Sequence, residues 1–178
     1  MKRGFLYALF ASVLGLPAQA ALESGATAPM FTTQASLGGK EFTFSLADAL
    51  IDGPVVLYFY PKAFTSGCTV EAHEFAEAVD EFKSLGATVI GISNDDIKTL
   101  NKFSVSECQS KFPVGADAGG KIIKSYDAAL LFSYANRTSY VIAPDGKVIY
   151  SYTALAPDQH VANTMAAVKK WRDSQAKG

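Results

Sequence analysis

The chain has 178 residues, of which 49% are hydrophobic and 19% are charged, with 16 basic and 17 acidic side chains. This balance is typical of a globular protein and excludes a disordered tail and a nucleic-acid-binding protein. A domain of about 150 residues folds without a disulfide framework or a structural metal. The two cysteines, Cys68 and Cys108, are too few for a disulfide scaffold or a four-thiolate zinc site. They indicate a redox pair or a single bridge.

Residues 1–20 have the pattern of a signal peptide. Lys2 and Arg3 give a basic start, residues 4–16 are an apolar run, and residues 18–20 form an A-x-A cleavage signal. The apolar run is short for a membrane span, which needs about 20 residues. We therefore expect export to the periplasm, removal of residues 1–20, no membrane attachment afterwards, and a single domain over residues 21–178.

Residues 54–93 predict a β-α-β unit. Residues 54–60 and 87–93 are continuous apolar runs, which are typical of strands covered on both faces. Between them, apolar residues from Phe75 to Phe82 recur at i, i+3, i+4 and i+7, and Gly86 ends the helix. Two strands joined by a helix in this way pair in parallel.

The remaining elements complete an α/β fold. The pattern predicts a helix over residues 95–110, a short strand over 112–114, a short helix over 120–126, a hairpin of 139–143 with 147–153, and a last helix from Pro157 whose apolar stripe reaches Trp171. Together these elements predict a central mixed β-sheet flanked by helices on both faces.

Cys68 stands where a reactive cysteine is expected, on the first turn of the helix that follows the strand 54–60. The unpaired N–H groups and the positive end of the helix dipole favour a thiolate there. A fast reaction also needs donors aimed at the charge that develops in the transition state. Thr65 can place its hydroxyl beside the sulfur across the first turn. Glu71, one turn after Cys68, disfavours the thiolate unless a cation neutralises it.

Pro61, Thr65 and Cys68 form the pattern P-x-x-x-T-x-x-C inside a longer match over residues 59–72. In this segment the sequence resembles the peroxiredoxins, and within them the peroxiredoxin Q group, also called bacterioferritin comigratory proteins. The resemblance implies a thioredoxin-like fold and a thiol peroxidase without cofactor or metal. It implies that Cys68 attacks the peroxide and becomes a sulfenic acid, that Pro61 shields the sulfur, and that Thr65 polarises the peroxide.

The same resemblance assigns a catalytic arginine to the start of a late strand. Arg137 fits this position and is the only arginine among residues 21–171. By the resemblance, Arg137 polarises the peroxide and pairs with Glu71, which supplies the neutralising cation. The resemblance also implies hydrogen peroxide and organic hydroperoxides as substrates and an exported thioredoxin-like dithiol as reductant. We expect a monomer or a weak dimer.

The second cysteine departs from the commonest pattern of the group. Many peroxiredoxin Q proteins carry a resolving cysteine five residues after the first, where this sequence has His73. Others carry it on the next helix, and Cys108 falls on the helix predicted there. We interpret Cys108 as the resolving cysteine, while an unpaired buried cysteine and a permanent structural bridge stay open as alternatives.

Other functions are disfavoured by missing residues. An exported thioredoxin-fold disulfide oxidoreductase needs a C-x-x-C pair, and a copper-binding assembly chaperone needs a second cysteine close to Cys68; the sequence has neither. A non-catalytic domain held by a Cys68 to Cys108 bridge is a further alternative. His73 and His160 both stand near predicted helix starts, and we interpret them as surface residues rather than metal ligands.

Overall fold

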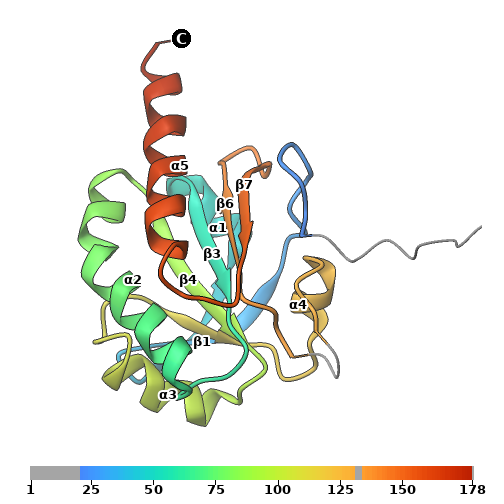
Figure 1. The fold of residues 1–178 in the computed structure, drawn as a ribbon, viewed down its shortest axis with the longest axis vertical. Coiled ribbons are helices and arrows are strands. Elements are labelled where there is room, and N and C mark those ends of the chain that lie inside the picture. The colour runs from blue at the N-terminus through green and yellow to red at the C-terminus, as the bar shows by residue number, and fades with distance from the viewer. Residues whose placement is uncertain (1–20, 131–133, 178) are drawn as a thin grey trace, which may run out of the picture.

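The computed structural model describes residues 21–130 and 134–177, which form a seven-stranded mixed sheet with helices on both faces (Figure 1). The strand order is β2-β1-β5-β4-β3-β6-β7. The predicted signal peptide, residues 1–20, lies outside the described residues. In chain order the elements are β1 (Thr32–Leu37), β2 (Lys40–Ser45), α1 (Leu46–Asp52), β3 (Val55–Phe59), α2 (Ser66–Ser84), β4 (Thr88–Ser93), α3 (Ile97–Ser106), β5 (Val114–Ala116), α4 (Lys121–Ser125), β6 (Thr138–Ile142), β7 (Val148–Thr153) and α5 (His160–Gln175).

The predicted β-α-β unit is confirmed in β3, α2 and β4. β3 pairs in parallel with β4, and all five of its residues are buried. Its side chains alternate between two cores: Val56 and Tyr58 pack in one, while Val55 and Leu57 pack in the other. This alternation explains why the strand has a continuous apolar sequence.

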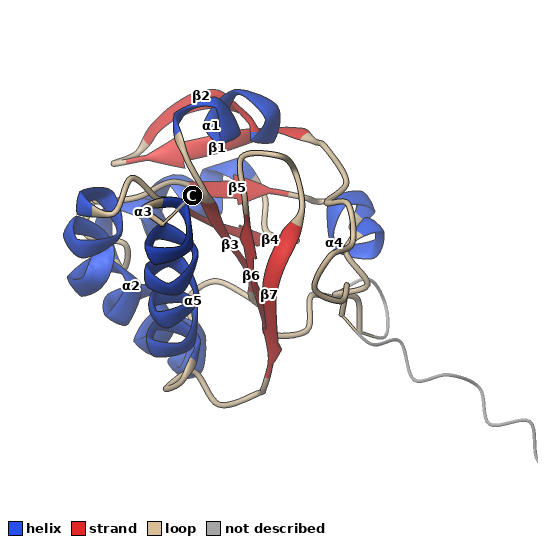
Figure 2. Cartoon of the chain, turned by 90° about the horizontal axis from the view of Figure 1, so that it is seen from above, coloured by secondary structure: helices blue, strands red, loops and turns tan. Residues whose placement is uncertain are grey.

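Two layers of helices cover the sheet, as Figure 2 shows from above. Residues of α2, α3 and α5 fill the core on one face, and residues of α1 and α4 fill the core on the other. In the first core the ring of Tyr58 stacks on Phe75 with a centroid distance of 4.4 Å. Cys68 and Cys108 are both buried in this core.

The helix predicted over residues 95–110 is too long, because α3 ends at Ser106. After α3, the N–H groups of Glu107 and Cys108 both donate to the carbonyl of Phe103, which closes the helix. Gln109 and Ser110 then take left-handed backbone conformations, with φ of 51° and 57°. The sequence has no glycine at this turn, although glycine is the residue that most often adopts a left-handed conformation. Cys108 therefore lies in a turn after the helix and not on it.

The register of β6 places the residue before it at the end of β3. β6 runs antiparallel to β3, with Phe59 opposite Thr138. The residue that precedes β6, Arg137, therefore stands beside the chain as it leaves β3 for α2. Among the described residues, no helix is long and apolar enough to cross a membrane.

Candidate active site

Cys68 is the third residue of α2, and only 1% of it is exposed. The first α-helical hydrogen bond of α2 runs from the N–H of Thr69 to the carbonyl of Thr65, at 2.9 Å. The N–H groups of residues 66–68 therefore have no partner within the helix and give this end a partial positive charge. The structure thus places the sulfur at the end of a helix that favours an anion.

The loop between β3 and α2 is fixed to the end of β4. The N–H of Ala63 donates to Asp95 Oδ2 at 2.7 Å, and the same oxygen accepts from Ser93 Oγ at 2.8 Å. Phe64 has a left-handed backbone with φ of 64°, and its ring packs edge-on against Phe103. A bulky residue adopts this conformation only where its surroundings impose it. Asp95 therefore helps to position the turn that carries Thr65 into α2.

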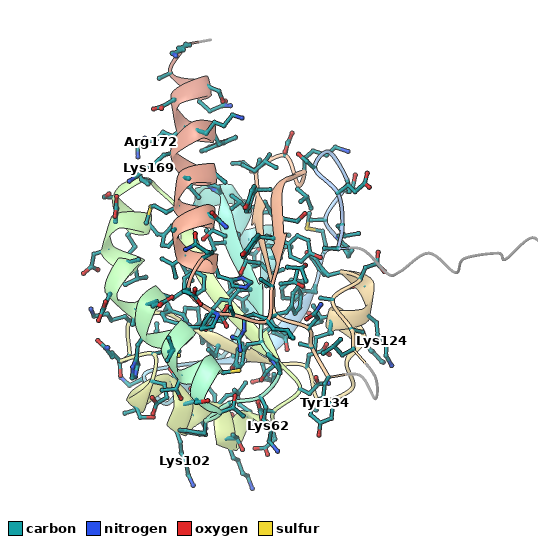
Figure 3. The ribbon with its side chains drawn as sticks, viewed as in Figure 1. Lys62, Lys102, Lys124, Tyr134, Lys169 and Arg172 are labelled. Atoms are coloured by element: carbon teal, nitrogen blue, oxygen red, sulfur yellow. The ribbon has the colours of Figure 1, made fainter. Side chains whose placement is uncertain are left out.

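Thr65 is the residue before the first turn of α2, and it is exposed. Its hydroxyl donates to the carbonyl of Lys62 at 2.9 Å and does not cap the helix. The single hydroxyl proton is used in this hydrogen bond. The lone pairs of the Thr65 oxygen therefore stay free to accept a hydrogen bond from another group. Pro61 precedes this turn, is partly buried, and lines a cavity of about 500 Å³ together with Lys62 and Tyr134. Figure 3 shows Lys62 and Tyr134 at the end of the molecule away from Lys169 and Arg172 of α5.

Arg137 is buried and holds three groups at once. Its Nη2 donates to Cys68 Sγ at 3.5 Å, its Nη1 donates to Glu71 Oε2, and its Nε donates to the carbonyl of Leu155 at 2.9 Å. Gly67 leaves room for this arrangement, since a Cβ there would stand 3.0 Å from Nη2. Burial alone would lower the pKa of Arg137, but the neighbouring Glu71 and Cys68 raise it overall. A fixed cation therefore faces the sulfur.

Glu71 is fully buried between Arg137 and the start of α5. One carboxyl oxygen, Oε2, accepts from Arg137, while Oε1 has no hydrogen-bond partner within residues 21–130 and 134–177. Burial raises the pKa of Glu71 to about 8, although the charge and the hydrogen bond of Arg137 oppose this rise. The structure thus brings Glu71, Arg137 and Cys68 together.

A profile of the AhpC/TSA family matches residues 24–151, which is most of the chain. The chain belongs to this family, the peroxiredoxins. Chloroplastic peroxiredoxin Q of Oryza sativa subsp. japonica is 33% identical over 175 residues, and the match covers 89% of this chain and 78% of the rice protein.

Solved structures agree in fold. Peroxidoxin BcpB from Mycobacterium tuberculosis superimposes with a TM-score of 0.77 and 30% identity, over 84% of this chain and 97% of that protein. Peroxiredoxin Q from Xanthomonas campestris superimposes with a TM-score of 0.70 and 26% identity, over 78% of this chain and 90% of that protein. The thioredoxin-like fold predicted from the sequence is confirmed, and the protein is a peroxidase of the oxidoreductase class.

Cys108 of this peroxiredoxin is fully buried, and its thiol is not bonded to Cys68. Burial, and after it the charge of Glu107, raise the pKa of the Cys108 thiol well above its usual range. The turn that holds Cys108 is tied to α2 by three contacts. His73 Nε2 lies 3.0 Å from Glu107 Oε2, and Lys111 Nζ donates to the carbonyl of Ala76 at 3.1 Å. Lys83 Nζ donates to the carbonyl of Lys111 at 3.4 Å.

The interpretation of His160 as a surface residue is wrong. Its side chain is 0% exposed, and its Nδ1 lies 3.7 Å from Glu71 Oε1. A histidine at a helix start carries no sequence signal of burial, because the packing of α5 against β6 and β7 decides it. His73 is partly exposed, with 44% of its side chain accessible.

Proposed function

We propose that Cys68 is the peroxide-reacting cysteine of this peroxiredoxin. The observation that carries the proposal is the 3.5 Å contact between Arg137 Nη2 and Cys68 Sγ at the N-terminal end of α2. A fixed guanidinium at this distance stabilises negative charge both on the sulfur and on the oxygens that react with it.

In the first step the Cys68 thiolate attacks the outer oxygen of the hydroperoxide. The S–O bond forms as the O–O bond breaks, so that the sulfur is oxidised to sulfenic acid and the peroxide is reduced. The leaving oxygen takes up a proton and departs as an alcohol or, from hydrogen peroxide, as water. Arg137 supports the charge on the leaving oxygen, and the Thr65 oxygen accepts the O–H of the bound peroxide because its own proton is held by Lys62. Pro61 shields the sulfur.

In the second step the Cys108 thiol attacks the Cys68 sulfenic acid. The S–S bond forms as the S–O bond breaks, and the oxygen leaves as water. Cys108 must first leave the core, because both sulfurs are buried and unbonded. A dithiol partner then reduces the disulfide through a mixed disulfide and is itself oxidised.

The substrates are hydrogen peroxide and organic hydroperoxides. One structural neighbour, a bacterioferritin comigratory protein from Xanthomonas campestris with 26% identity, is described for alkyl peroxide reduction. Another, from Plasmodium yoelii, is named thioredoxin peroxidase I and superimposes with a TM-score of 0.78 and 26% identity. These names support an alkyl hydroperoxide substrate and a thioredoxin-like reductant. Family membership favours a peroxidase over the disulfide oxidoreductase and the copper chaperone.

Trapping of the sulfenic acid tests the assignment of Cys68. Reduced protein is mixed with one equivalent of hydrogen peroxide in the presence of dimedone, and the adduct is located by mass spectrometry. We expect no adduct in Cys68→Ser, accumulation of the Cys68 adduct in Cys108→Ser, and severe loss of peroxidase activity in Thr65→Val and Arg137→Ala. Peroxidase activity in Cys68→Ser would overturn the assignment.

We further propose that residues 1–20 direct export to the periplasm, where an exported thioredoxin-like dithiol recycles the enzyme. The support is the basic, apolar and A-x-A pattern of these residues. Expression of the full chain in a Gram-negative host, followed by N-terminal mass analysis of the periplasmic fraction, tests this proposal. A chain that starts at Ala21 supports it, and an unprocessed chain found in the cytoplasm contradicts it.

A further inference from the structure

A line of buried polar groups continues from the sulfur beyond Glu71. Arg137 joins Cys68 to Glu71, Glu71 faces His160, and His160 contacts Ser139 of β6. His160 and Ser139 are both fully buried. Polar groups in a core are costly unless each has a partner, so the protons in this line must be arranged to satisfy them all.

The tautomer of His160 follows from its neighbours. Its Nε2 lies 3.0 Å from the carbonyl of Ala154, which can only accept, and so Nε2 carries a proton. In the neutral ring Nδ1 is therefore an acceptor. Ser139 Oγ lies 2.8 Å from Nδ1 and can donate to it. Neutral His160 thus has a single Nδ1 lone pair, and no donor, for the two groups that face this atom, Ser139 and Glu71.

The outer oxygen of Glu71, Oε1, is a buried atom with no hydrogen-bond partner among the described residues, and His160 Nδ1 lies 3.7 Å from it. One proton placed between these two atoms gives Oε1 a partner after a small closing movement. On Oε1 the proton is accepted by the Nδ1 lone pair in place of the Ser139 hydroxyl proton, and on Nδ1 it is shared between Ser139 Oγ and Oε1. In either position the pair of Glu71 and His160 is neutral, and without that proton it carries one negative charge.

We propose that His160 is a positioning residue of the peroxide-reducing site, which holds a shared proton against the outer oxygen of Glu71 and so sets the charge that Arg137 presents to Cys68. The inference rests on the proposed role of Cys68. When the pair is neutral, the positive charge of Arg137 is directed to the sulfur and the peroxide. When the pair loses its proton, the full charge of Glu71 competes for the same guanidinium.

The surrounding charges are compatible with a proton that resides mainly on Glu71. Burial raises the pKa of Glu71 to about 8, and Glu74 adds to the rise, while Arg137 opposes it. Burial lowers the pKa of His160, as does Arg137, although the Ala154 carbonyl and Asp158 oppose this. Besides these groups, Glu71 shares α2 with Cys68, and the ring of Tyr152 packs edge-on against His160.

The pH dependence of Cys68 oxidation tests the proposal. Oxidation by hydrogen peroxide is followed in single-turnover experiments on the Cys108→Ser protein, so that only the first step is seen. We expect the rate constant to fall above about pH 8, where the pair loses its proton. The fall should vanish in Glu71→Gln. In His160→Leu the fall should move to a pH about one unit lower, because protonated Glu71 loses the acceptor that stabilises it. His73→Leu, which replaces the other histidine, should keep the original profile.

The tautomer of His160 gives a second test that needs no activity. In ¹⁵N-labelled His73→Leu protein the ring signals come from His160 alone. We expect a neutral, Nε2-protonated ring near pH 7, and a change in the Nδ1 shift as the pH passes through the transition of Glu71. Glu71→Gln should abolish that change.

Two results would overturn the proposal: an Nδ1 signal indifferent to Glu71→Gln, or a His160→Leu protein with an unchanged pH profile. A failure of the proposed role of Cys68 looks different, because then no variant shows rapid oxidation of the thiol while the ¹⁵N test still reports on the pair.

Discussion

Three hydrogen bonds fix Arg137 beside the Cys68 sulfur, and its neighbour Gly67 leaves the space that this needs. A cation next to Glu71 is predictable from the sequence, because a carboxylate one turn after a reactive cysteine disfavours the thiolate unless its charge is neutralised. The sequence does not reveal the third hydrogen bond, to the carbonyl of Leu155, or the burial of His160. Both depend on how the segment after β7 and the helix α5 fold back over the sheet.

Gly67→Ala tests whether the exact position of the Arg137 guanidinium matters, because this variant keeps the arginine but moves it. A methyl group at residue 67 would stand 3.0 Å from Arg137 Nη2, so the guanidinium must shift by a few tenths of an ångström. Because a misplacement of about 1 Å can cost about 100-fold in rate, we expect this smaller shift to slow oxidation of Cys68 by peroxide by about threefold. Stopped-flow oxidation at one pH measures this rate. Ser66→Ala, an exposed neighbour on the same turn, is the matched control and should react like the original protein. Equal rates in Gly67→Ala and the original protein would contradict the assigned contact.

The buried carboxyl of Glu71 predicts a particular dependence of stability on pH. Its pKa rises from 4.5 to about 8 on folding, so between these values the folded state binds more protons than the unfolded state. The stability that Glu71 contributes is therefore complete below about pH 4.5 and is lost as the pH rises to about 8. The loss is at most about 1.4 kcal/mol per pH unit.

Urea unfolding between about pH 7.2 and 8 measures this effect. In this window the unfolded histidines are mostly neutral, because their pKa is about 6.5, so His160, whose pKa is lowered by burial, contributes little to the slope. We expect the free energy of unfolding to fall with pH in the original protein and to be flatter in Glu71→Gln. Parallel slopes for the two proteins would show that Glu71 is ionised throughout the window.

At the scale of elements, the predictions succeed where apolar runs are continuous and fail where a boundary depends on a turn. β3 and β4 are buried over nearly their whole length and α2 is buried along one face, and their sequences have the matching apolar patterns. β1 and β2 pair with each other near the edge of the sheet, and the mostly exposed residues of β2 give no continuous apolar run. After α3 the chain turns through two residues with left-handed backbone conformations, Gln109 and Ser110. Neither is a glycine, so the sequence does not indicate where the helix ends.

The turn that carries Cys108 must open before the disulfide forms, and the contact between His73 and Glu107 joins that turn to α2. A partly exposed polar contact of this kind is worth about 0.5 kcal/mol, so its loss should speed the opening by about twofold. We expect His73→Ala to form the Cys68 to Cys108 disulfide about twice as fast, with no change in the oxidation of Cys68.

Rapid quenching with an alkylating reagent, followed by mass spectrometry, resolves the two steps. Glu107→Gln weakens the same pair from its other side and should have a similar effect. Slower disulfide formation in both variants would contradict the view that this contact restrains Cys108.

At the scale of the whole molecule, both cysteines belong to one core, and they are not bonded to each other. The sequence predicts the fold class because the β-α-β unit and the hairpin carry clear patterns. It does not place the second cysteine, because the position of a buried turn relative to another helix is a product of long-range packing. We expect the disulfide form to need a rearranged core, because both thiols are buried and unbonded in the reduced form.

Oxidation should therefore lower the stability of the molecule. A structural disulfide between Cys68 and Cys108 would raise the free energy of unfolding by roughly 4 kcal/mol, because it restricts the unfolded chain. A disulfide that removes Cys108 from the core loses the packing contacts of that side chain. We therefore expect the oxidised protein to melt at a lower temperature than the reduced protein. Calorimetry of both forms measures the difference, with Cys108→Ser as the control that oxidation cannot bridge. A markedly higher melting temperature after oxidation would favour the structural bridge.

The central claim is that folding activates Cys68 through α2 and Arg137. The most direct test is the rate of thiol loss when one equivalent of hydrogen peroxide meets the fully reduced chain, with the urea-unfolded chain as the unassisted reference. We predict rapid loss of two thiols in the folded chain but not in the unfolded chain, because Cys108 reacts with the Cys68 sulfenic acid to form the disulfide. If folded and unfolded thiols react at the same rate, the site does not activate Cys68 and the account is wrong.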